Sequence, residues 1–427
     1  MVPHLITALT GPINELEARV LDSMPAIERW LRLEWMEHTP PFYASVDLRN
    51  AGFKLAPVDT DLFPRGFNHL TEEMLPLAVQ AAMAAIEKIC PEAKNLLIVP
   101  QDDDGPFHAE HLERLVRIFT MAGLNVRLGS LDPSLATPRR IALPGGGALA
   151  VEPLVRSRRR LGLKDFDPCT ILLNHDLAGG TPKLLEGLHE QYLLPPLHAG
   201  WVVRRKSRHF QSYEEVAKKF AKLLGMDPWL ITPMSGGTVR LATDDRRGLE
   251  SLKAAADALL ARLRRKHKEY GIADKPFVVV KADDGSRGAG VVSLRDAAEL
   301  DSGGRWAASP LAAGEEVREL LVQEGVATNE RINDAVAEPV VCTMDRYVIG
   351  GYYRVHAGRR ADENLSSPGS TFVPLAFAPS HQLPRPGVAP GASPPNRFYM
   401  YGVIGRLAML AAAYELEATD PEAEHYD

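Results

Sequence analysis

The chain has 427 residues, of which 45% are hydrophobic and 24% charged, and its formal net charge is -6. The length and composition suit a globular protein of two or three domains at about 150 residues each. The negative net charge argues against a basic nucleic-acid binder. The sequence has no long apolar run, which argues against a membrane protein. The three cysteines lie far apart with no metal-site spacing, which excludes a disulfide scaffold and a cysteine zinc site. Because we also find no pattern of a secretory signal, we expect a cytoplasmic protein.

The first half of the chain alternates between helix and strand patterns. Apolar residues at helical spacing predict two helices within the first forty residues, and residues 42–59 read as two short strands around a turn at residues 50–52. The elements predicted next are a helix at residues 72–90, a strand at 95–100, a helix at 108–121, strands at 124–129 and 169–174, and a helix at 184–192. This alternation predicts a mostly parallel sheet covered by helices, and residues 100–105 and 174–177 follow its strands, where such sheets bind ligands.

The second half begins near Trp201 and has a different pattern. Residues 213–224 and 248–270 predict amphipathic helices, a strand follows at residues 277–281, and residues 317–377 are rich in strand patterns. The tail after Glu415 is acidic, so we expect it to fray.

The strongest chemical signal is a strand–loop–strand pattern in which an apolar strand ends in Lys281. The glycine-rich loop that follows contains Gly285, Ser286, Gly288 and Gly290. Glycines let backbone amides approach phosphates closely, and a lysine adds a positive charge. A Walker A loop or a Rossmann fingerprint needs a helix after the loop, and a kinase loop has its lysine on the following strand. Lysine before a glycine-rich hairpin is instead the ATP-grasp arrangement, with a plain surface hairpin as the alternative.

A second signal lies about forty residues later, where an apolar strand runs into Gln323, Glu324 and Val326. This segment resembles one that binds adenine through its backbone, although an ordinary strand end has the same pattern. A third signal is Arg354 followed by Asp362 and Asn364. Side chains two residues apart on an extended segment face the same side, and oxygen ligands of this kind hold Mg²⁺ against phosphates. The alternatives are a polar turn, or Glu363 as the ligand in place of Asp362.

A short non-helical stretch is crowded with polar side chains, and we interpret it as an amino-acid substrate pocket. An arginine there can bind a carboxylate through two hydrogen bonds, and an aspartate can bind an ammonium group. The alternative is a solvated loop. The candidate residues are Ser45, Asp47, Arg49, Lys54, Asp59 and Asn68.

The chain resembles the ATP-grasp-type glutamate–cysteine ligase found in some proteobacteria. The matching stretches are residues 42–70, 171–182, 200–210, the Lys281 loop and residues 322–377. The resemblance implies an α/β ATP-grasp fold with an N-terminal parallel-sheet domain of the pre-ATP-grasp type. The units implied are a substrate-binding domain at residues 1–200, a lid with the glycine-rich loop at 201–300, a subdomain with the metal site at 301–415 and an acidic tail at 416–427.

The resemblance further implies an ADP-forming ligase of the first step of glutathione biosynthesis. Such an enzyme joins the γ-carboxylate of L-glutamate to the amine of L-cysteine through an acyl phosphate. The alternatives are a related ATP-grasp ligase with another acceptor amino acid or peptide, and a nucleotide-binding regulator without catalysis. The retained Lys281, Asp362 and Asn364 speak against a regulator.

Individual roles also follow from the resemblance. Lys206 and Lys281 would hold the phosphates of ATP, and Arg354 would face the transferring phosphoryl group, so that Lys281 and Arg354 are the catalytic residues. Arg354 stands where related synthetases carry an acidic ligand, so Glu338 would complete the Mg²⁺ set, with Mn²⁺ as an alternative ion. The partners implied are the small molecules ATP, L-glutamate and L-cysteine, without nucleic acid or membrane. The resemblance leaves open whether the chain forms a homo-oligomer.

Overall fold

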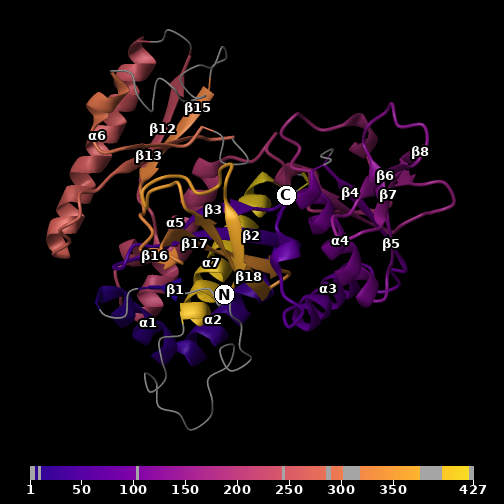
Figure 1. Cartoon of the computed structure of the whole chain (residues 1–427), viewed down its shortest axis with the longest axis horizontal. Helices are drawn as coiled ribbons and strands as arrows, with labels where there is room; N and C mark the ends of the chain where they lie inside the picture. The colour runs from indigo at the N-terminus through magenta and orange to yellow at the C-terminus, as the bar shows by residue number, and fades with distance from the viewer. Residues whose placement is uncertain are drawn as a thin grey trace.

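The structure is a computed structural model, and it describes residues 5–7, 11–101, 105–242, 246–284, 290–301, 318–375 and 397–422. The described residues form three large sheets with helices packed against them, which confirms the predicted α/β class. Figure 1 shows a central sheet with a second sheet on one side and, on the other, a smaller sheet that carries a long helix. No helix within the described residues combines the length and apolar character that a membrane crossing needs.

The central sheet is antiparallel and combines strands from both ends of the chain. Its strands are β1 (Leu5–Ile6), β2 (Tyr43–Asn50), β3 (Leu55–Asp61), β16 (Glu330–Ile332), β17 (Ala335–Met344), β18 (Tyr347–His356) and β19 (Thr371–Pro374). The two strands predicted within residues 42–59 are therefore confirmed. β2 pairs with β17, opposite Val340 at Asp47, and this pairing crosses the boundary predicted after residue 200.

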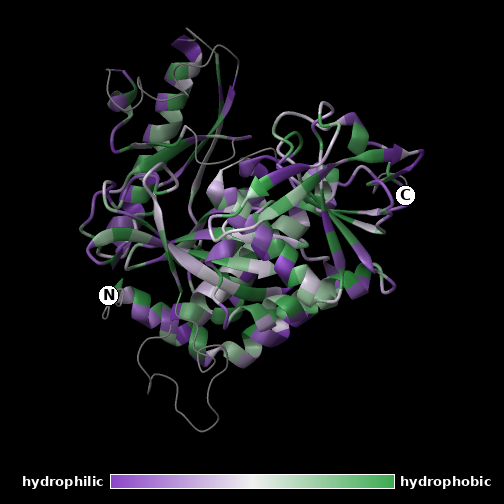
Figure 2. Ribbon diagram, turned by 45° about the vertical axis from the view of Figure 1, so that its right-hand side comes forward, coloured by the Kyte–Doolittle hydropathy of each residue, from purple (hydrophilic) through white to green (hydrophobic). Residues whose placement is uncertain are grey.

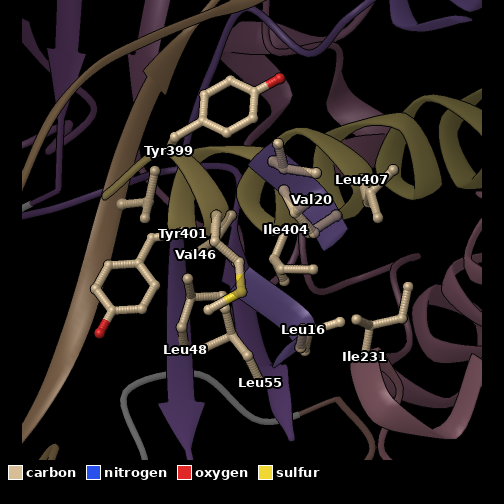
Figure 3. Close-up of a cluster of buried hydrophobic side chains, with 14 of the residues drawn as sticks. Leu16, Val20, Val46, Leu48, Leu55, Ile231, Tyr399, Tyr401, Ile404 and Leu407 are labelled. Carbon is tan, nitrogen blue, oxygen red and sulfur yellow. The ribbon is translucent and has the colours of Figure 1, made fainter. Parts of the chain in front are cut away.

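One face of the central sheet packs on helices. These are α1 (Pro12–Asp22), α2 (Met24–Glu37), α5 (Lys206–Leu224) and α7 (Arg397–Thr419). In Figure 3, Ile404 and Leu407 of α7 lie among side chains of β2, β3 and α1, such as Leu48 and Leu16. Helix α7 is apolar on nearly every side, as expected for a helix enclosed in the core. It continues to Thr419, so the prediction of a frayed tail is wrong for the first residues after Glu415, and residues 423–427 lie outside the described residues.

The second sheet is mostly parallel, as the alternating pattern predicts. Its strands, in spatial order, are β11 (Tyr192–Leu194), β10 (Thr170–Asn174), β4 (Asn95–Pro100), β5 (Asn125–Ser130), β7 (Ala148–Pro153) and β6 (Arg139–Ala142), with only β6 antiparallel. Helices α3 (Leu75–Ile89) and α4 (Pro106–Met121) cover one face. The other face carries a separate ribbon of β8 (Val155–Ser157) and β9 (Arg160–Gly162), whose Leu161 packs with Leu97 and Leu173.

One local prediction in this part of the chain is wrong. The helix predicted at residues 184–192 is a 3-10 turn at Lys183–Leu185 followed by β11, because Gly187 has a φ of +64° that ends any helix there. Cys90 and Cys169, in the same part of the chain, are half-buried thiols. Their sulfur atoms lie 2.7 Å apart, although 79 residues separate them in sequence.

The third sheet, the lid sheet, is antiparallel. It consists of β12 (Ser235–Leu241), β15 (Arg318–Glu324), β13 (Val278–Ala282) and β14 (Val292–Leu294), in that spatial order, and α6 (Arg246–Glu269) packs on one face. The pairing of β15 with β13 crosses the boundary predicted at residue 300, while the division into domains stays a prediction. Figure 2 shows green and purple bands along helices, as expected where one helix face packs on a core and the other faces outward.

Candidate active site

A cavity of about 550 Å³ lies where the three large sheets meet. It is lined by thirteen of the predicted site residues, which are Ser45, Asp47, Arg49, Asp59, Lys206, Lys281, Gln323, Glu324, Val326, Glu338, Arg354, Asp362 and Asn364. Gly285, Ser286 and Gly288 lie outside the described residues. The structure thus brings together side chains from segments that are far apart in the sequence.

Two lysines converge beside β3. Lys206 Nζ lies 2.6 Å from Asp59 Oδ1, and Lys281 Nζ donates to the carbonyl of Val58 at 3.0 Å. Burial and the charge of Lys206 lower the pKa of Lys281 to about 7. Burial raises the pKa of Asp59, but the two lysines outweigh it and bring this pKa to about 2. Two amino groups beside one carboxylate form a site suited to a polyanion such as a phosphate chain.

The start of α5 is fixed to the end of β13 through Asp283. Both carboxylate oxygens of Asp283 accept hydrogen bonds of 2.6 Å, one from Ser207 N and one from Ser207 Oγ. Lys206 N donates to the carbonyl of Asp283 at 2.8 Å. A carboxylate at a helix N-terminus satisfies free N–H groups and the helix dipole. This contact holds Lys206 beside Lys281, and sequence reasoning missed Asp283 because its partner lies 76 residues away.

Two arginines and two carboxylates form a buried network on the cavity wall. Arg354 Nη1 donates to Asp47 Oδ2 at 2.6 Å and to Glu338 Oε1 at 2.7 Å, while Arg49 Nε donates to Glu338 Oε2 at 2.8 Å. Burial, together with the nearby charge of Glu338, raises the pKa of Asp47 to about 6, although Arg354 acts to lower it. The pairs β2–β17 and β17–β18 place these residues on neighbouring strands, so the network follows from strand register.

Arg49 differs from the predicted carboxylate-binding geometry. Besides Glu338, its guanidinium donates to the carbonyls of Val326, Ala361 and Glu363 at 3.2, 3.4 and 2.6 Å. A substrate carboxylate that bound both terminal nitrogens would have to displace these contacts. The geometry therefore favours Arg49 as a link between β2, the end of β15 and the loop between β18 and β19. This loop, residues 357–370, is called the 360s loop below.

At the end of β15, the side chain of Gln323 and several apolar residues line one part of the cavity, which we call the recess at Gln323. Gln323 is 2% exposed, and its Nε2 has no hydrogen-bond partner among the described residues. Val279, Ala282 and Val326 line the cavity nearby. An apolar recess with an unsatisfied amide donor fits a flat heterocyclic ring that carries hydrogen-bond acceptors, such as a nucleobase.

Lys54 and Asn68, which were predicted to bind substrate, do not line the cavity. Lys54 is fully buried, with Nζ 2.9 Å from both carboxylate oxygens of Glu324. Asn68 is half-buried, and its Nδ2 donates to Glu110 at 3.4 Å. The structure therefore does not bring either residue to the cavity, and their roles in substrate binding stay predictions. Gly290 is described as well, and it lies outside the cavity lining.

The predicted metal ligands lie at the cavity but bind arginines. Asp362 Oδ2 is 2.7 Å from Arg295 Nη2 and its Oδ1 is 3.2 Å from Arg360 Nε, while Glu338 gives one oxygen to each arginine of the network. Asn364 Oδ1 accepts from Ser366 N at 3.0 Å. Within the described residues no group of three or more His, Cys, Asp or Glu side chains is arranged to hold a metal ion. The oxygen donors suit Mg²⁺, but this arrangement gives them to guanidinium groups.

The cavity lining beside the second sheet contains polar residues that were not among the predicted site residues. Gln101 and Asp176 follow β4 and β10, in the two segments predicted to carry ligand loops, and residues 102–104 lie outside the described residues. Asp61 and Arg65 complete this part of the lining, with the aromatic rings of Phe107, Tyr352 and Phe372 beside them. The rule that ligands bind at the carboxyl ends of parallel strands indicates this location but not the particular side chains.

The chain is similar to known proteins over nearly its whole length. A solved structure of a protein from Methylobacillus flagellatus KT, assigned as a gamma-glutamylcysteine synthetase, has 49% sequence identity and a TM-score of 0.90, over 98% of this chain and 100% of that chain. No curated protein matches the chain. A family model described as glutamate-cysteine ligase matches residues 17–416. Because that match covers most of the sequence, the chain belongs to the glutamate–cysteine ligase family.

Proposed function

We propose that the cavity uses ATP to activate the γ-carboxylate of L-glutamate and passes it to the amine of L-cysteine. Membership of the family makes the chain a ligase of glutathione biosynthesis, and the family implies the use of ATP and a divalent metal ion in general. The observation that carries the proposal is the convergence of Lys206 and Lys281 at Asp59, beside the recess at Gln323. Phosphates and base of one nucleotide would span these two places.

The ATP-grasp arrangement is part of this proposal. Lys281 lies on β13 of the antiparallel lid sheet, the glycine-rich loop follows it, and β14 returns along β13. The loop with Gly285, Ser286, Gly288 and Gly290 would cover the phosphates. The backbone of Glu324 and Val326, at the end of β15, would face the base. The domain boundaries, a cytoplasmic location and a homo-oligomer stay predictions.

The chemistry proposed needs no protein nucleophile. A γ-carboxylate oxygen of glutamate attacks the γ-phosphorus of ATP, the bond to the β-phosphate oxygen breaks, and an acyl phosphate and ADP result. The cysteine amine then attacks the acyl carbon, phosphate leaves, and the amine loses a proton. Lys281 and Arg354 stabilise the charge that develops, and the other groups position the reactants.

A bound divalent ion neutralises phosphate charge in such reactions. We propose Glu338, Asp362 and Asn364 as the residues that hold Mg²⁺, or Mn²⁺ in its place. To hold the ion, each carboxylate would give up a contact to an arginine, because Arg295, Arg360, Arg49 and Arg354 occupy the carboxylate oxygens.

ADP release with a panel of amino acids tests the proposed function. The purified chain should release ADP only when L-glutamate and L-cysteine are both present, and mass spectrometry should identify γ-glutamylcysteine as the product. Faster turnover with another acceptor amino acid or a peptide in place of cysteine would support the related-ligase alternative. ADP release at the same rate with and without glutamate would contradict the proposal.

A further inference from the structure

Three aromatic side chains on the cavity wall have no role in the chemistry above. Phe107 belongs to α4, Tyr352 to β18 and Phe372 to β19, and all three line the cavity. The ring centroid of Phe372 lies 5.5 Å from those of both Phe107 and Tyr352. Phe107 and Phe372 are only half-buried, so these two rings keep apolar surface open to the cavity. We call the three residues the aromatic cluster.

Strand register places the aromatic cluster directly beside Arg354. Arg354 on β18 pairs with Phe372 on β19, and the side chains of such a pair share one face of the sheet, with Cβ atoms about 5 Å apart. Tyr352 precedes Arg354 by two residues on β18 and therefore points to the same face. Because Arg354 is the residue that we propose to stabilise the reacting groups, the aromatic cluster adjoins the reaction centre.

His69 packs on the aromatic cluster and is uncharged at neutral pH. Its ring centroid lies 4.2 Å from that of Phe372, in a stacked arrangement, and 4.9 Å from that of Tyr352. Burial, together with the charge of Arg354, lowers the pKa of His69 to about 4. The cavity wall at the aromatic cluster is therefore uncharged. Such a surface disfavours a charged substrate group and favours an apolar or weakly polar one.

The position of the aromatic cluster separates it from the proposed nucleotide. Strands β3, β2, β17, β18 and β19 are neighbours in that order across the central sheet. Lys206 and Lys281 contact β3, whereas β19 lies at the opposite edge, roughly 19 Å away at about 4.8 Å per strand. Since the phosphates and the base of ATP would bind at the lysines and the recess at Gln323, the aromatic cluster is left to an amino-acid substrate.

Charge and length favour cysteine over glutamate at the aromatic cluster. The head of glutamate carries an ammonium and a carboxylate group, which both need polar partners. Cysteine brings its amine to the reaction centre, and its sulfur is three bonds, roughly 3–4 Å, from that amine. An amine beside Arg354 therefore places the sulfur within reach of Phe372 on the neighbouring strand. A sulfur atom makes favourable contacts with aromatic rings, whereas a hydroxyl group would lose its hydrogen bonds to water there.

We propose that Phe107, Tyr352 and Phe372 form the subsite for the side chain of the acceptor amino acid and select a thiol over a hydroxyl group. The inference rests on the proposed function and adds to it the residues that choose the acceptor. An apolar pocket discriminates against a hydroxyl group by roughly 100-fold. The unmodified chain should therefore use cysteine best, the apolar and similarly sized L-2-aminobutyrate less well, and L-serine least.

Replacing one ring by a hydroxyl-bearing side chain should weaken this ranking. Phe372→Ser should lower kcat/KM for cysteine roughly 10- to 100-fold and narrow the preference for cysteine over serine about tenfold, because the hydroxyl of the substrate gains a hydrogen-bonding partner. Phe107→Ser, on a different element, should act in the same direction. Phe372→Leu keeps an apolar side chain and should retain most of the preference. Mass spectrometry of the γ-glutamyl product formed with each acceptor measures these values.

Hydroxylamine separates acceptor binding from glutamate activation, because it is an acceptor without a side chain. Phe372→Ser should form γ-glutamyl hydroxamate within about twofold of the unmodified rate, and KM for ATP and glutamate should also change less than about twofold. Melting temperatures report on the folding of each variant. As a control, Tyr192 on β11 is exposed and lies outside the cavity lining, so Tyr192→Ser should leave the acceptor preference unchanged.

An unchanged ratio of cysteine to serine use in a folded Phe372→Ser or Phe107→Ser variant overturns the inference. A selective rise in KM for glutamate also overturns it, since that result would assign the aromatic cluster to the donor. Preference of the unmodified chain for serine over cysteine contradicts it as well. If the unmodified chain forms neither a γ-glutamyl product nor the hydroxamate from ATP and glutamate, the proposed function fails instead.

Discussion

Arg295, the residue directly after β14, forms an ion pair with Asp362, with Nη2 and Oδ2 2.7 Å apart, and so joins the lid sheet to the 360s loop. Ser293 on β14 donates to the backbone carbonyl of Asp362 at 2.6 Å. Burial raises the pKa of Asp362, but Arg295 and Arg360 outweigh it, and the pKa falls below its usual value. The carboxylate therefore stays ionised and holds a guanidinium group where we propose that a metal ion binds.

Removing Arg295 should ease metal binding. Since the guanidinium competes with Mg²⁺ for Asp362, Arg295→Ala should lower the Mg²⁺ concentration for half-maximal activity about two- to fivefold, a modest change because Arg295 is half exposed. Asn364→Ala should raise that concentration, with partial rescue by Mn²⁺. Activity measured against free Mg²⁺ checks both, and Arg264→Ala on the exposed face of α6 is the control. Equal Mg²⁺ requirements in all variants would remove Asp362 and Asn364 from the metal site.

Nucleotide binding should take up a proton at Lys281. The pKa of this lysine is lowered to about 7, so most of it is neutral at pH 8 in the free protein. Phosphates favour the ammonium form and raise the pKa, and binding at pH 8 should therefore take up as much as about one proton, but far less at pH 6. Calorimetry in buffers of different ionisation enthalpy measures this uptake. Lys281→Arg stays charged and should abolish it, whereas equal uptake in this variant would contradict the assignment.

The sequence predicts the segment around Lys281 better than the rest of the candidate site. Lys281 is recognisable because its strand, loop and returning strand are contiguous, and the strands of residues 42–59 follow from local pattern. Arg65 and Asp283 act through contacts with distant segments, and no local signal marks them. The same reason explains why a predicted substrate residue can lie away from the cavity. Lys54 has the polarity of a pocket residue, but pairing with Glu324 places it in the core.

Periodicity also fails where an element is buried on all sides. Helix α7 lies between the central sheet and the other helices, and its apolar residues run around the whole helix rather than along one stripe. A 3.6-residue pattern arises only when one face meets water, so α7 gives no such signal. The proximity of Cys90 and Cys169 is likewise a property of tertiary packing that their sequence spacing cannot indicate.

Arg49→Ala should disturb the fold of the site rather than glutamate binding alone. It leaves Glu338 with Arg354 as its partner and removes three contacts to backbone carbonyls. We expect a lower melting temperature and a rise in KM for both ATP and glutamate. Arg49→Lys should recover little, because an ammonium group cannot reproduce the planar fork. A rise in KM for glutamate alone, at an unchanged melting temperature, would identify Arg49 as a substrate ligand.

Lys54→Ala should destabilise the chain without a selective kinetic effect. It leaves the Glu324 carboxylate buried without its cation, which costs about 3–5 kcal/mol in comparable pairs. Denaturant unfolding measures the loss. The double variant Lys54→Met with Glu324→Gln should recover part of it, because no buried charge remains unpaired. An unchanged free energy of unfolding together with a raised KM for glutamate would restore Lys54 to the substrate pocket.

Hydroxylamine trapping tests most directly whether the cavity activates glutamate with ATP. With ATP, Mg²⁺ and L-glutamate present and L-cysteine omitted, hydroxylamine should intercept the acyl phosphate, and γ-glutamyl hydroxamate should form in step with ADP. Lys281→Ala should slow both products together, roughly 10- to 100-fold, because it removes one charge-assisted phosphate contact. ADP release that depends on glutamate but yields no hydroxamate, or hydroxamate formation at the original rate in Lys281→Ala, would contradict this mechanism.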